Sequence, residues 1–172
     1  MNKLEGRMQN MLNALQEQET PLEYTLSGMD LGSARNRMLA QNLAYNKTLM
    51  SLHVARKGIL DHDGIVLAYM LRTNKVLRKL ELEGNNLGPL CAFAFGRVLQ
   101  ENKSLRFLDL ESNQLTNDGS DFKGVLEMLN FLDHNDTLMS LNIANNSLNE
   151  DCGAKLREKL ENNYSIIDID YS

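Results

Sequence analysis

The sequence predicts an α/β repeat protein, built from six units that each hold one short strand and one helix. Three observations lead to this fold class. A strand pattern rich in leucine recurs along the 172 residues, its copies begin at nearly constant spacing, and the segments between the copies carry apolar residues at helical intervals. A fixed period of this length is typical of one supersecondary unit repeated along the chain.

The strand pattern is L-x-x-L-x-L-x-x-N-x-L. It begins at Leu49 (LMSLHVARKGI), Leu77 (LRKLELEGNNL), Leu105 (LRFLDLESNQL) and Leu138 (LMSLNIANNSL). The first leucines are 28, 28 and 33 residues apart, and a further step of 28 reaches Ile166 in IIDIDY. One step of 28 back from Leu49 reaches PLEYTLSGMDLG, so six strands are expected.

Two sets of asparagines follow the same spacing. One set stands three residues before each of the last five strand patterns, where asparagine suits the left-handed conformation that ends a helix: Asn46, Asn74, Asn102, Asn135 and Asn163. The other set lies inside the pattern and is expected to satisfy buried backbone groups of the turn: Asn85, Asn113 and Asn146. Lys57 and Met29 replace this second asparagine in the first two units, so less regular turns are expected there.

The remaining segments are predicted to be helices. DHDGIVLAYMLRTN and PLCAFAFGRVLQEN each place apolar residues on adjoining helical positions. Residues 2–19 form an amphipathic helix with Leu4, Met8, Met11, Leu12 and Leu15 on one face. Since a repeat array needs a cap, residues 1–20 are expected to be a capping helix and residues 21–172 the repeat domain. Docking of the methionine-bearing face on a partner is the alternative.

The period and the strand pattern together resemble the leucine-rich repeats of the ribonuclease-inhibitor subfamily, over residues 21–171. The resemblance implies a leucine-rich repeat solenoid, with a curved parallel sheet of about six strands on the concave face and helices on the convex face. It does not imply the activity of the inhibitor, because one fold hosts many functions.

Composition narrows the classes of partner. The net charge of −5 gives neither nucleic acid nor an anionic membrane a basic field to bind, so neither is expected as a partner. The sequence contains no apolar run of the length of a signal peptide or a membrane span, and its two cysteines do not suggest a disulfide framework. A cytoplasmic protein is expected.

No residues suggest catalysis. The sequence has no glycine-rich phosphate loop after a strand, no GxSxG and no HExxH, and no nucleophile, base and orienting group are expected close together. The segment DHDG resembles a metal cluster, but Asp61 or Asp63 at a helix start is an ordinary N-cap. We therefore predict no enzyme, no cofactor and no metal site.

Two irregular places remain. The step of 33 adds five residues between Leu115 and Leu138, enough for about a turn and a half of helix or a small loop. Such insertions often meet partners, but one without a function is equally compatible with the sequence. The last strand, with Asp168 and Asp170, is expected either to protect its own edge with these charges or to be continued by a longer chain.

The candidate site lies on the concave face, to which the non-leucine strand positions point. The fifth pattern position is expected to align across the sheet as Thr25, His53, Glu81, Asp109, Asn142 and Asp170, and the seventh as Ser27, Ala55, Glu83, Glu111 and Ala144. The four carboxylates of Glu81, Glu83, Asp109 and Glu111 would then lie close together with no cation in the same rows. Their repulsion would destabilise the fold, and a cationic partner would relieve it. The third position adds Lys79 and the aromatic Phe107.

The sequence thus predicts a non-catalytic protein-interaction module, whose partner carries a basic patch. The predicted partner-binding residues are His53, Lys79, Glu81, Glu83, Phe107, Asp109 and Glu111. A solvated polar face is the plain alternative. The repeat type is also similar to that of Ran-type GTPase activators and tropomodulin-like proteins, which implies, as a second function, regulation of a small GTPase or of actin, or an axonemal or cytoskeletal scaffold.

Overall fold

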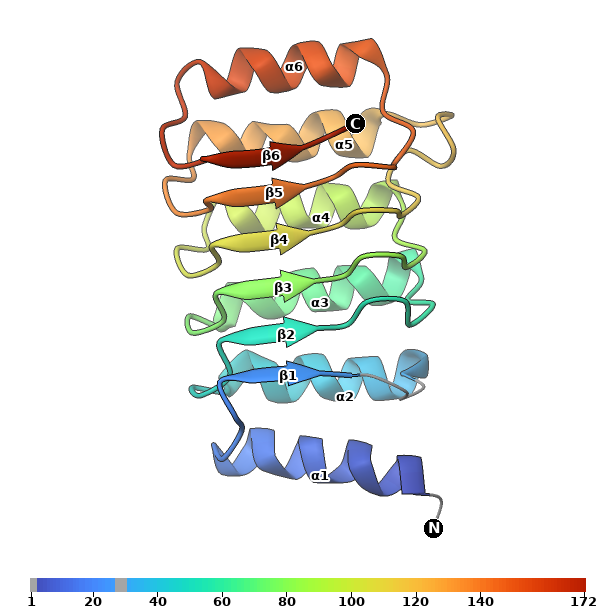
Figure 1. Cartoon of the computed structure of the whole chain (residues 1–172), viewed down its shortest axis with the longest axis vertical. Coiled ribbons are helices and arrows are strands. Elements are labelled where there is room, and N and C mark those ends of the chain that lie inside the picture. Colours follow the sequence, from blue (N-terminus) through green and yellow to red (C-terminus); the bar gives the residue numbers. More distant parts are fainter. Residues whose placement is uncertain (1–2, 27–30) are drawn as a thin grey trace.

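The chain forms a regular stack of strand–helix units in the computed structural model, which describes residues 3–26 and 31–172 and, for residues 3–5, the backbone alone (Figure 1). The strands are β1 Glu23–Thr25, β2 Ser51–His53, β3 Lys79–Glu81, β4 Phe107–Asp109, β5 Ser140–Asn142 and β6 Asp168–Asp170. The helices are α1 Lys3–Glu17, α2 Gly32–Tyr45, α3 Asp61–Thr73, α4 Pro89–Leu99, α5 Lys123–Met128, the 3₁₀ helix η1 Leu129–Asp133, and α6 Glu150–Leu160.

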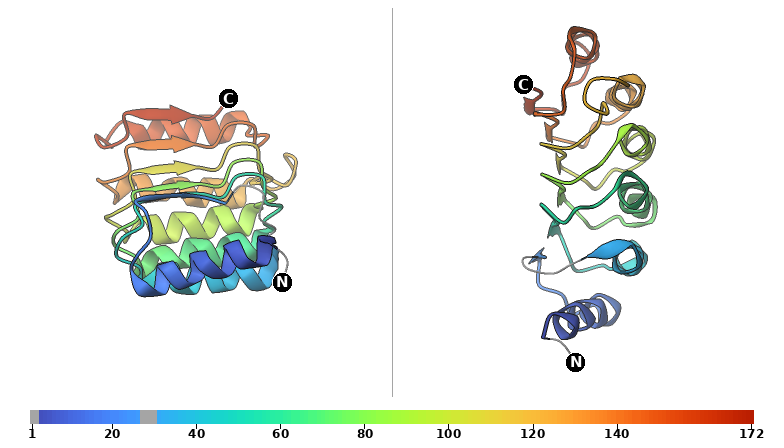
Figure 2. Two further views of the ribbon diagram at one scale, coloured as in Figure 1. Left: turned by 60° about the horizontal axis from the view of Figure 1, so that its bottom comes forward. Right: turned by 90° about the vertical axis from the view of Figure 1, so that its right-hand side faces the viewer.

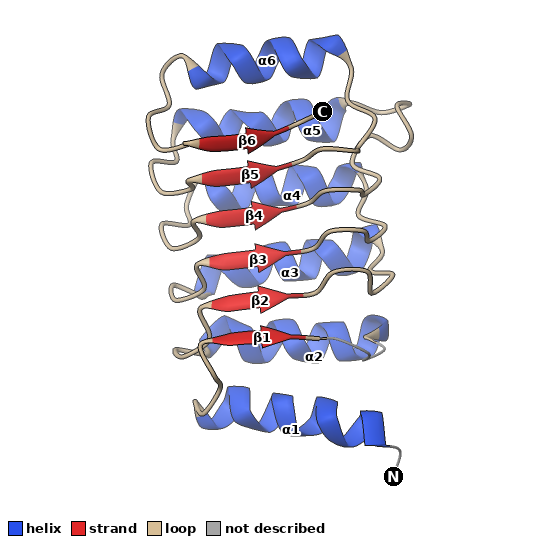
Figure 3. Cartoon of the chain, in the orientation of Figure 1, coloured by secondary structure: helices blue, strands red, loops and turns tan. Residues whose placement is uncertain are grey.

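All six strands belong to one parallel sheet in the order β1-β2-β3-β4-β5-β6 (Figure 3). The helices lie in a second layer on one side of this sheet (Figure 2). Each strand is only three residues long, because the chain turns away after the sixth pattern position. The predicted α/β repeat fold with six strands is confirmed.

The core lies between the sheet and the helices. Within the third unit the pattern leucines are fully buried: Leu77, Leu80, Leu82 and Leu87 each have 0% exposure. The corresponding positions of the fourth and fifth units are buried in the same way, except for the half-buried Leu148. Two apolar residues of α4 do not join the core, since Leu90 and Phe93 are 67% and 42% exposed.

The asparagines inside the pattern join each turn to the turn before it. Asn85 donates through Nδ2 to the carbonyls of Val54 (2.9 Å) and Leu82 (2.8 Å), and its Oδ1 accepts from the N–H groups of Lys57 and Ile59. Asn113 and Asn146 make equivalent bonds one and two repeats later. The predicted bracing role of these three residues is confirmed, while Met29 lies outside the described residues.

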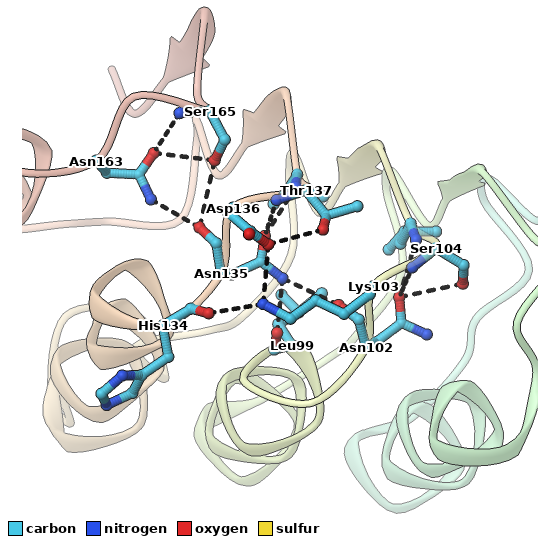
Figure 4. A network of polar contacts seen from close by, with 12 residues as sticks. Leu99, Asn102, Lys103, Ser104, His134, Asn135, Asp136, Thr137, Asn163 and Ser165 are labelled. Carbon is cyan, nitrogen blue, oxygen red and sulfur yellow. Dashed lines mark hydrogen bonds and ion pairs between the residues drawn. The ribbon is translucent and has the colours of Figure 1, made fainter.

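The asparagines that follow the helices form a second row of hydrogen bonds between repeats, here called the second ladder. It lies at the end of the sheet where the strands begin (Figure 4). Asn102 donates to the carbonyls of Leu71 (2.8 Å) and Asn74 (3.2 Å) in the preceding repeat, and its Oδ1 accepts from the N–H groups of Ser104 and Leu105. Asn46, Asn74, Asn135 and Asn163 repeat this arrangement.

The expectation that these asparagines adopt the left-handed conformation is wrong for Asn46 and Asn74, the two that directly follow their helices as C-cap residues. Asn46 has φ −70° and ψ 137°, and Asn74 has φ −68° and ψ 126°. The extended backbone lets the side chain turn inward and reach the preceding repeat, and the hydrogen bonds gained there decide the conformation.

Helix α1 lies at the N-terminal end of the stack, next to α2. Met11, Leu12 and Leu15 are buried, and the carbonyl of Leu15 accepts the first bond of the second ladder, from Asn46 (3.0 Å). The division into a capping helix, residues 1–20, and a repeat domain, residues 21–172, stays a prediction.

One detail of the helices differs from the sequence-based expectation, and another decides between two alternatives that the sequence left open. Asp61 does not cap its own helix: its Oδ1 accepts from the N–H groups of Gly88 (2.9 Å) and Cys91 (2.7 Å) and so caps α4 of the next repeat. The five extra residues add a loop before α5 rather than helical turns, and Asn117, Asp118 and Gly119 in it all have positive φ.

Both cysteines are free and buried, and burial raises the pKa of each thiol, so neither is a reactive group. Among residues 3–26 and 31–172, no group of histidine, cysteine and acidic side chains is arranged to hold a metal ion. None of the described helices is long and apolar enough to cross a membrane.

The second ladder makes a stability prediction. Replacing Asn102, which is 0% exposed, with alanine leaves two carbonyls and two N–H groups of the buried turns without their partner. Asn102→Ala should lower the free energy of unfolding by about 2–4 kcal/mol, measured by urea denaturation. The exposed Asn162→Ala is the control, expected to change it by less than about 0.5 kcal/mol; equal effects would contradict a bracing role.

Candidate functional site on the concave face

The strand register brings the predicted residues into two rows on the concave face. In the row of fifth positions His53 lies beside Glu81, and Glu81 beside Asp109. In the row of third positions Lys79 lies beside Phe107. This alignment agrees with the pattern, whose constant spacing places equivalent positions on neighbouring strands about 4.8 Å apart.

The expectation that the carboxylates have no cation near them is wrong. Lys79 Nζ lies 2.5 Å from Glu81 Oε1, and His53 Nδ1 contacts Glu81 Oε2. Burial opposes the charge of Glu81, but hydrogen bonds from Lys79 and His53 outweigh it, so the pKa of Glu81 lies below its ordinary value. Arg56, from the turn after β2, reaches across and places Nη2 2.7 Å from Glu83 Oε1.

Glu111 is also satisfied. It accepts hydrogen bonds from two amides of the following repeat, Asn142 Nδ2 at 2.8 Å and Asn145 Nδ2 at 3.1 Å. Three of the four carboxylates therefore have partners. Those of Glu83 and Glu111 reach diagonally between repeats, which the linear pattern did not predict, whereas Glu81 is paired within its own strand and with its neighbour in the row.

Asp109 is the exception. Among the described residues its side-chain carboxylate receives one hydrogen bond, from the backbone N–H of Glu111 (2.9 Å), and no cation lies within ion-pair distance of it. Burial raises the pKa of Asp109, and repulsion from Glu111, Glu81 and Glu83 raises it further, against the effect of that hydrogen bond. The negative charge of Asp109 is thus the least compensated of the four.

A hollow of about 370 Å³ lies over this carboxylate. Its walls bring together four of the predicted residues, Lys79, Glu81, Phe107 and Asp109, and Phe107 is 42% exposed. His53, Glu83 and Glu111 do not line the hollow. The sequence-based selection of binding residues omitted four polar residues that do: Ser140, Asn142, Asp168 and Asp170. They occupy the same third and fifth positions in β5 and β6, so the pattern itself was the signal that could have included them.

Ser51, His53 and Glu81 form a hydrogen-bonded chain, which corrects the expectation that no nucleophile, base and orienting group lie close together. Ser51 Oγ is 3.1 Å from His53 Nε2, and Nδ1 contacts Glu81. However, Glu23 Oε1 lies 2.8 Å from the same Nε2. The same ring nitrogen therefore faces both the hydroxyl of Ser51 and the carboxylate of Glu23, and the two compete for it. These side chains link β1, β2 and β3 to one another.

Comparison with known proteins agrees with this architecture. A family model described as "Leucine Rich repeat" matches residues 101–119, and no curated protein matches the sequence significantly. The structure titled "Leiomodin-1 Actin-Binding Site 2 (ABS2)" is similar at 20% identity and a TM-score of 0.70, over 88% of this chain and 86% of that one. The tropomodulin C-terminal domain of Caenorhabditis elegans is similar at 21% identity and a TM-score of 0.71, over 91% and 93%.

These similarities, together with the repeated strand–helix unit and its buried asparagines, define the class of the protein. The chain has a leucine-rich repeat fold of the ribonuclease-inhibitor-like type, as the resemblance of its repeats implied. At 20–21% identity the likeness to the two solved structures shows the fold alone.

The raised pKa of Asp109 leads to a prediction about how the stability of the chain changes with pH. Its pKa is raised in the folded chain, so its charge lowers stability above that pKa, and this penalty disappears as falling pH protonates it. Asp109→Asn keeps the acceptor for the N–H of Glu111, as Asn142 does one repeat later for Ala144. The variant should gain about 0.5 kcal/mol at pH 7, a gain that vanishes below the ordinary aspartate pKa.

The measurement is urea denaturation of both proteins between pH 3 and pH 7. Asp121→Asn is the matched control, because Asp121 Oδ1 accepts a similar bond from the N–H of Lys123 (3.0 Å) at an exposed site. A pH-independent difference at Asp109, or the same gain at Asp121, would contradict the assigned cause.

Proposed function

We propose that the chain is a non-catalytic, cytoplasmic protein-interaction module that holds a cationic segment of a protein partner on its concave face. The proposed contact residues are His53, Lys79, Glu81, Glu83, Phe107, Asp109 and Glu111. One observation carries the proposal: Asp109, with a charge that no described cation compensates, stands in a hollow beside an exposed aromatic ring.

The chemistry of the hollow suits an arginine or lysine side chain. A guanidinium or ammonium group placed over Asp109 would compensate its charge, and the side chain or its planar head would pack on Phe107. Asp168 and Asp170 line the same hollow and add negative potential. Nucleic acids and anionic membranes do not fit such a surface, because their phosphates would be repelled.

The surroundings support a binding role because they hold the surface in place. Glu81 is fixed by Lys79 and His53, and Glu111 by two amides. A partner therefore meets a face whose neighbouring side chains are already ordered, and it loses less affinity to their immobilisation. The proposal that the chain is not an enzyme is supported by Glu23, whose carboxylate lies 2.8 Å from the ring nitrogen of His53 that faces Ser51 and so competes with the serine for it.

Binding of a labelled hexa-arginine peptide, followed by fluorescence anisotropy at low salt, tests the proposal. Asp109→Asn should weaken binding about 3- to 10-fold, because a charged contact is lost. Phe107→Ala should weaken it about 2- to 5-fold through loss of the aromatic contact. Asp121→Asn removes the same formal charge from an exposed site outside the hollow and should bind as the unmodified chain does. Equal affinity of all four proteins would refute the site.

Actin is a second candidate partner. The observation that favours it is the similarity to leiomodin-1 actin-binding site 2, which covers 88% of this chain. If this face binds actin, the chain should sediment with actin filaments or shift monomeric actin in analytical ultracentrifugation, and Phe107→Ala should reduce the bound fraction several-fold. Absence of binding to both forms of actin would remove this candidate and leave the general proposal standing.

A further inference from the structure

A second charged surface lies at the end of the sheet where the strands begin, beside the first residues of β3 and β4. We call it the basic rim; it consists of Lys75, Arg78, Lys103 and Arg106. These residues come from two equivalent positions in two successive repeats, the residue after the ladder asparagine and the second residue of the strand pattern. Lys75, Lys103 and Arg106 are exposed, and Arg78 is half-buried.

Hydrogen bonds to backbone carbonyls hold the two loops of the rim side by side. The N–H of Arg106 donates to the carbonyl of Arg78 at 2.7 Å, and Asn102 Nδ2 donates to the carbonyl of Asn74 at 3.2 Å. Arg78 Nη1 donates to the carbonyl of Ser104 at 2.8 Å, which keeps its guanidinium against the loop that carries Lys103. The rim is therefore a surface whose geometry the repeat itself imposes.

Most of its charge is uncompensated. Lys103 Nζ is 2.9 Å from Asp136 and also donates to the carbonyl of His134 (Figure 4). Within the described part of the chain, Lys75, Arg78 and Arg106 have no carboxylate within ion-pair distance. Equivalent residues of adjacent repeats are about 4.8 Å apart, well inside the screening length of about 8 Å at physiological salt.

This concentration of positive charge opposes the balance of the whole chain, which has a net charge of −5. Like charges on adjacent strands destabilise the fold unless something binds them. An anionic ligand at the rim would remove that repulsion and gain ion pairs, among them charge-assisted hydrogen bonds with the two arginines. The rim thus has a physical reason to bind anions that does not depend on the concave hollow.

We propose that the basic rim is a second interaction surface, which binds a short acidic segment, rich in aspartate or glutamate, of a protein. The rim is two repeats wide, with Asp136 and Glu101 at its flanks and the carboxylates of the concave face next to it. A short segment places its charges between these carboxylates. A membrane surface or a nucleic acid is an extended polyanion and would be repelled by them.

A labelled hexa-glutamate peptide, titrated with the full chain at low and at physiological salt, tests the proposal by fluorescence anisotropy. The unmodified chain should bind, with an affinity that falls as salt rises. The double variant Lys75→Glu, Arg106→Glu should weaken binding at least about ten-fold. Both side chains are exposed and hold no backbone group, and the change removes like-charge repulsion, so the variant should unfold at a temperature no lower than that of the unmodified chain.

The control is the double variant Arg37→Glu, Lys123→Glu, which changes the net charge equally at exposed positions on α2 and α5. It should keep most of the affinity. Asp109→Asn should bind hexa-glutamate as the unmodified chain does, so failure at the rim is distinguishable from failure of the concave site. No binding by the unmodified chain, an equal loss in the control, or tighter rim-dependent binding to phosphatidylserine vesicles or single-stranded DNA would each overturn the proposal.

Discussion

Hydrogen bonds from buried asparagine side chains hold this structure in register. Each repeat turns twice, once after its strand and once after its helix, and both turns leave backbone groups inside the protein. At both turns of the third, fourth and fifth repeats, an asparagine such as Asn85 or Asn102 donates to a carbonyl of the preceding repeat. An unpaired buried peptide group costs about 1–3 kcal/mol, so each repeat is held at one offset from its neighbour.

That constant offset turns a pattern along the chain into rows across a surface. Equivalent side chains from successive strands lie next to each other. A charge that occurs at the same position in two successive repeats therefore lies beside a like charge. The same register produces the acidic hollow around Asp109 and the basic rim at the strand starts, two surfaces of opposite sign. A partner with both kinds of charge would bind in one orientation.

The fold was predictable to an unusual depth because a repeat protein is held by contacts between neighbours in sequence. The number of strands and the inward asparagines follow from spacing, and the resemblance of the repeats implied the parallel order. The errors concern contacts between repeats. Asp61 caps the next helix, Arg56 reaches Glu83 from a turn, and Asn46 and Asn74 are extended because their side chains bond to the repeat before.

The sequence by itself determined the architecture and the rows, including the presence of Glu81, Asp109 and Phe107 on one face, since alternation along a strand decides which side chains point outward. Only the tertiary structure decided which carboxylate has no side-chain partner. Long side chains such as Lys79, and amides such as Asn142, have several possible partners within reach. Which partner they bind depends on distances in the folded chain that the spacing of residues in the sequence does not give. The outcome is that Asp109 has the least compensated charge of the four and presents it to a partner.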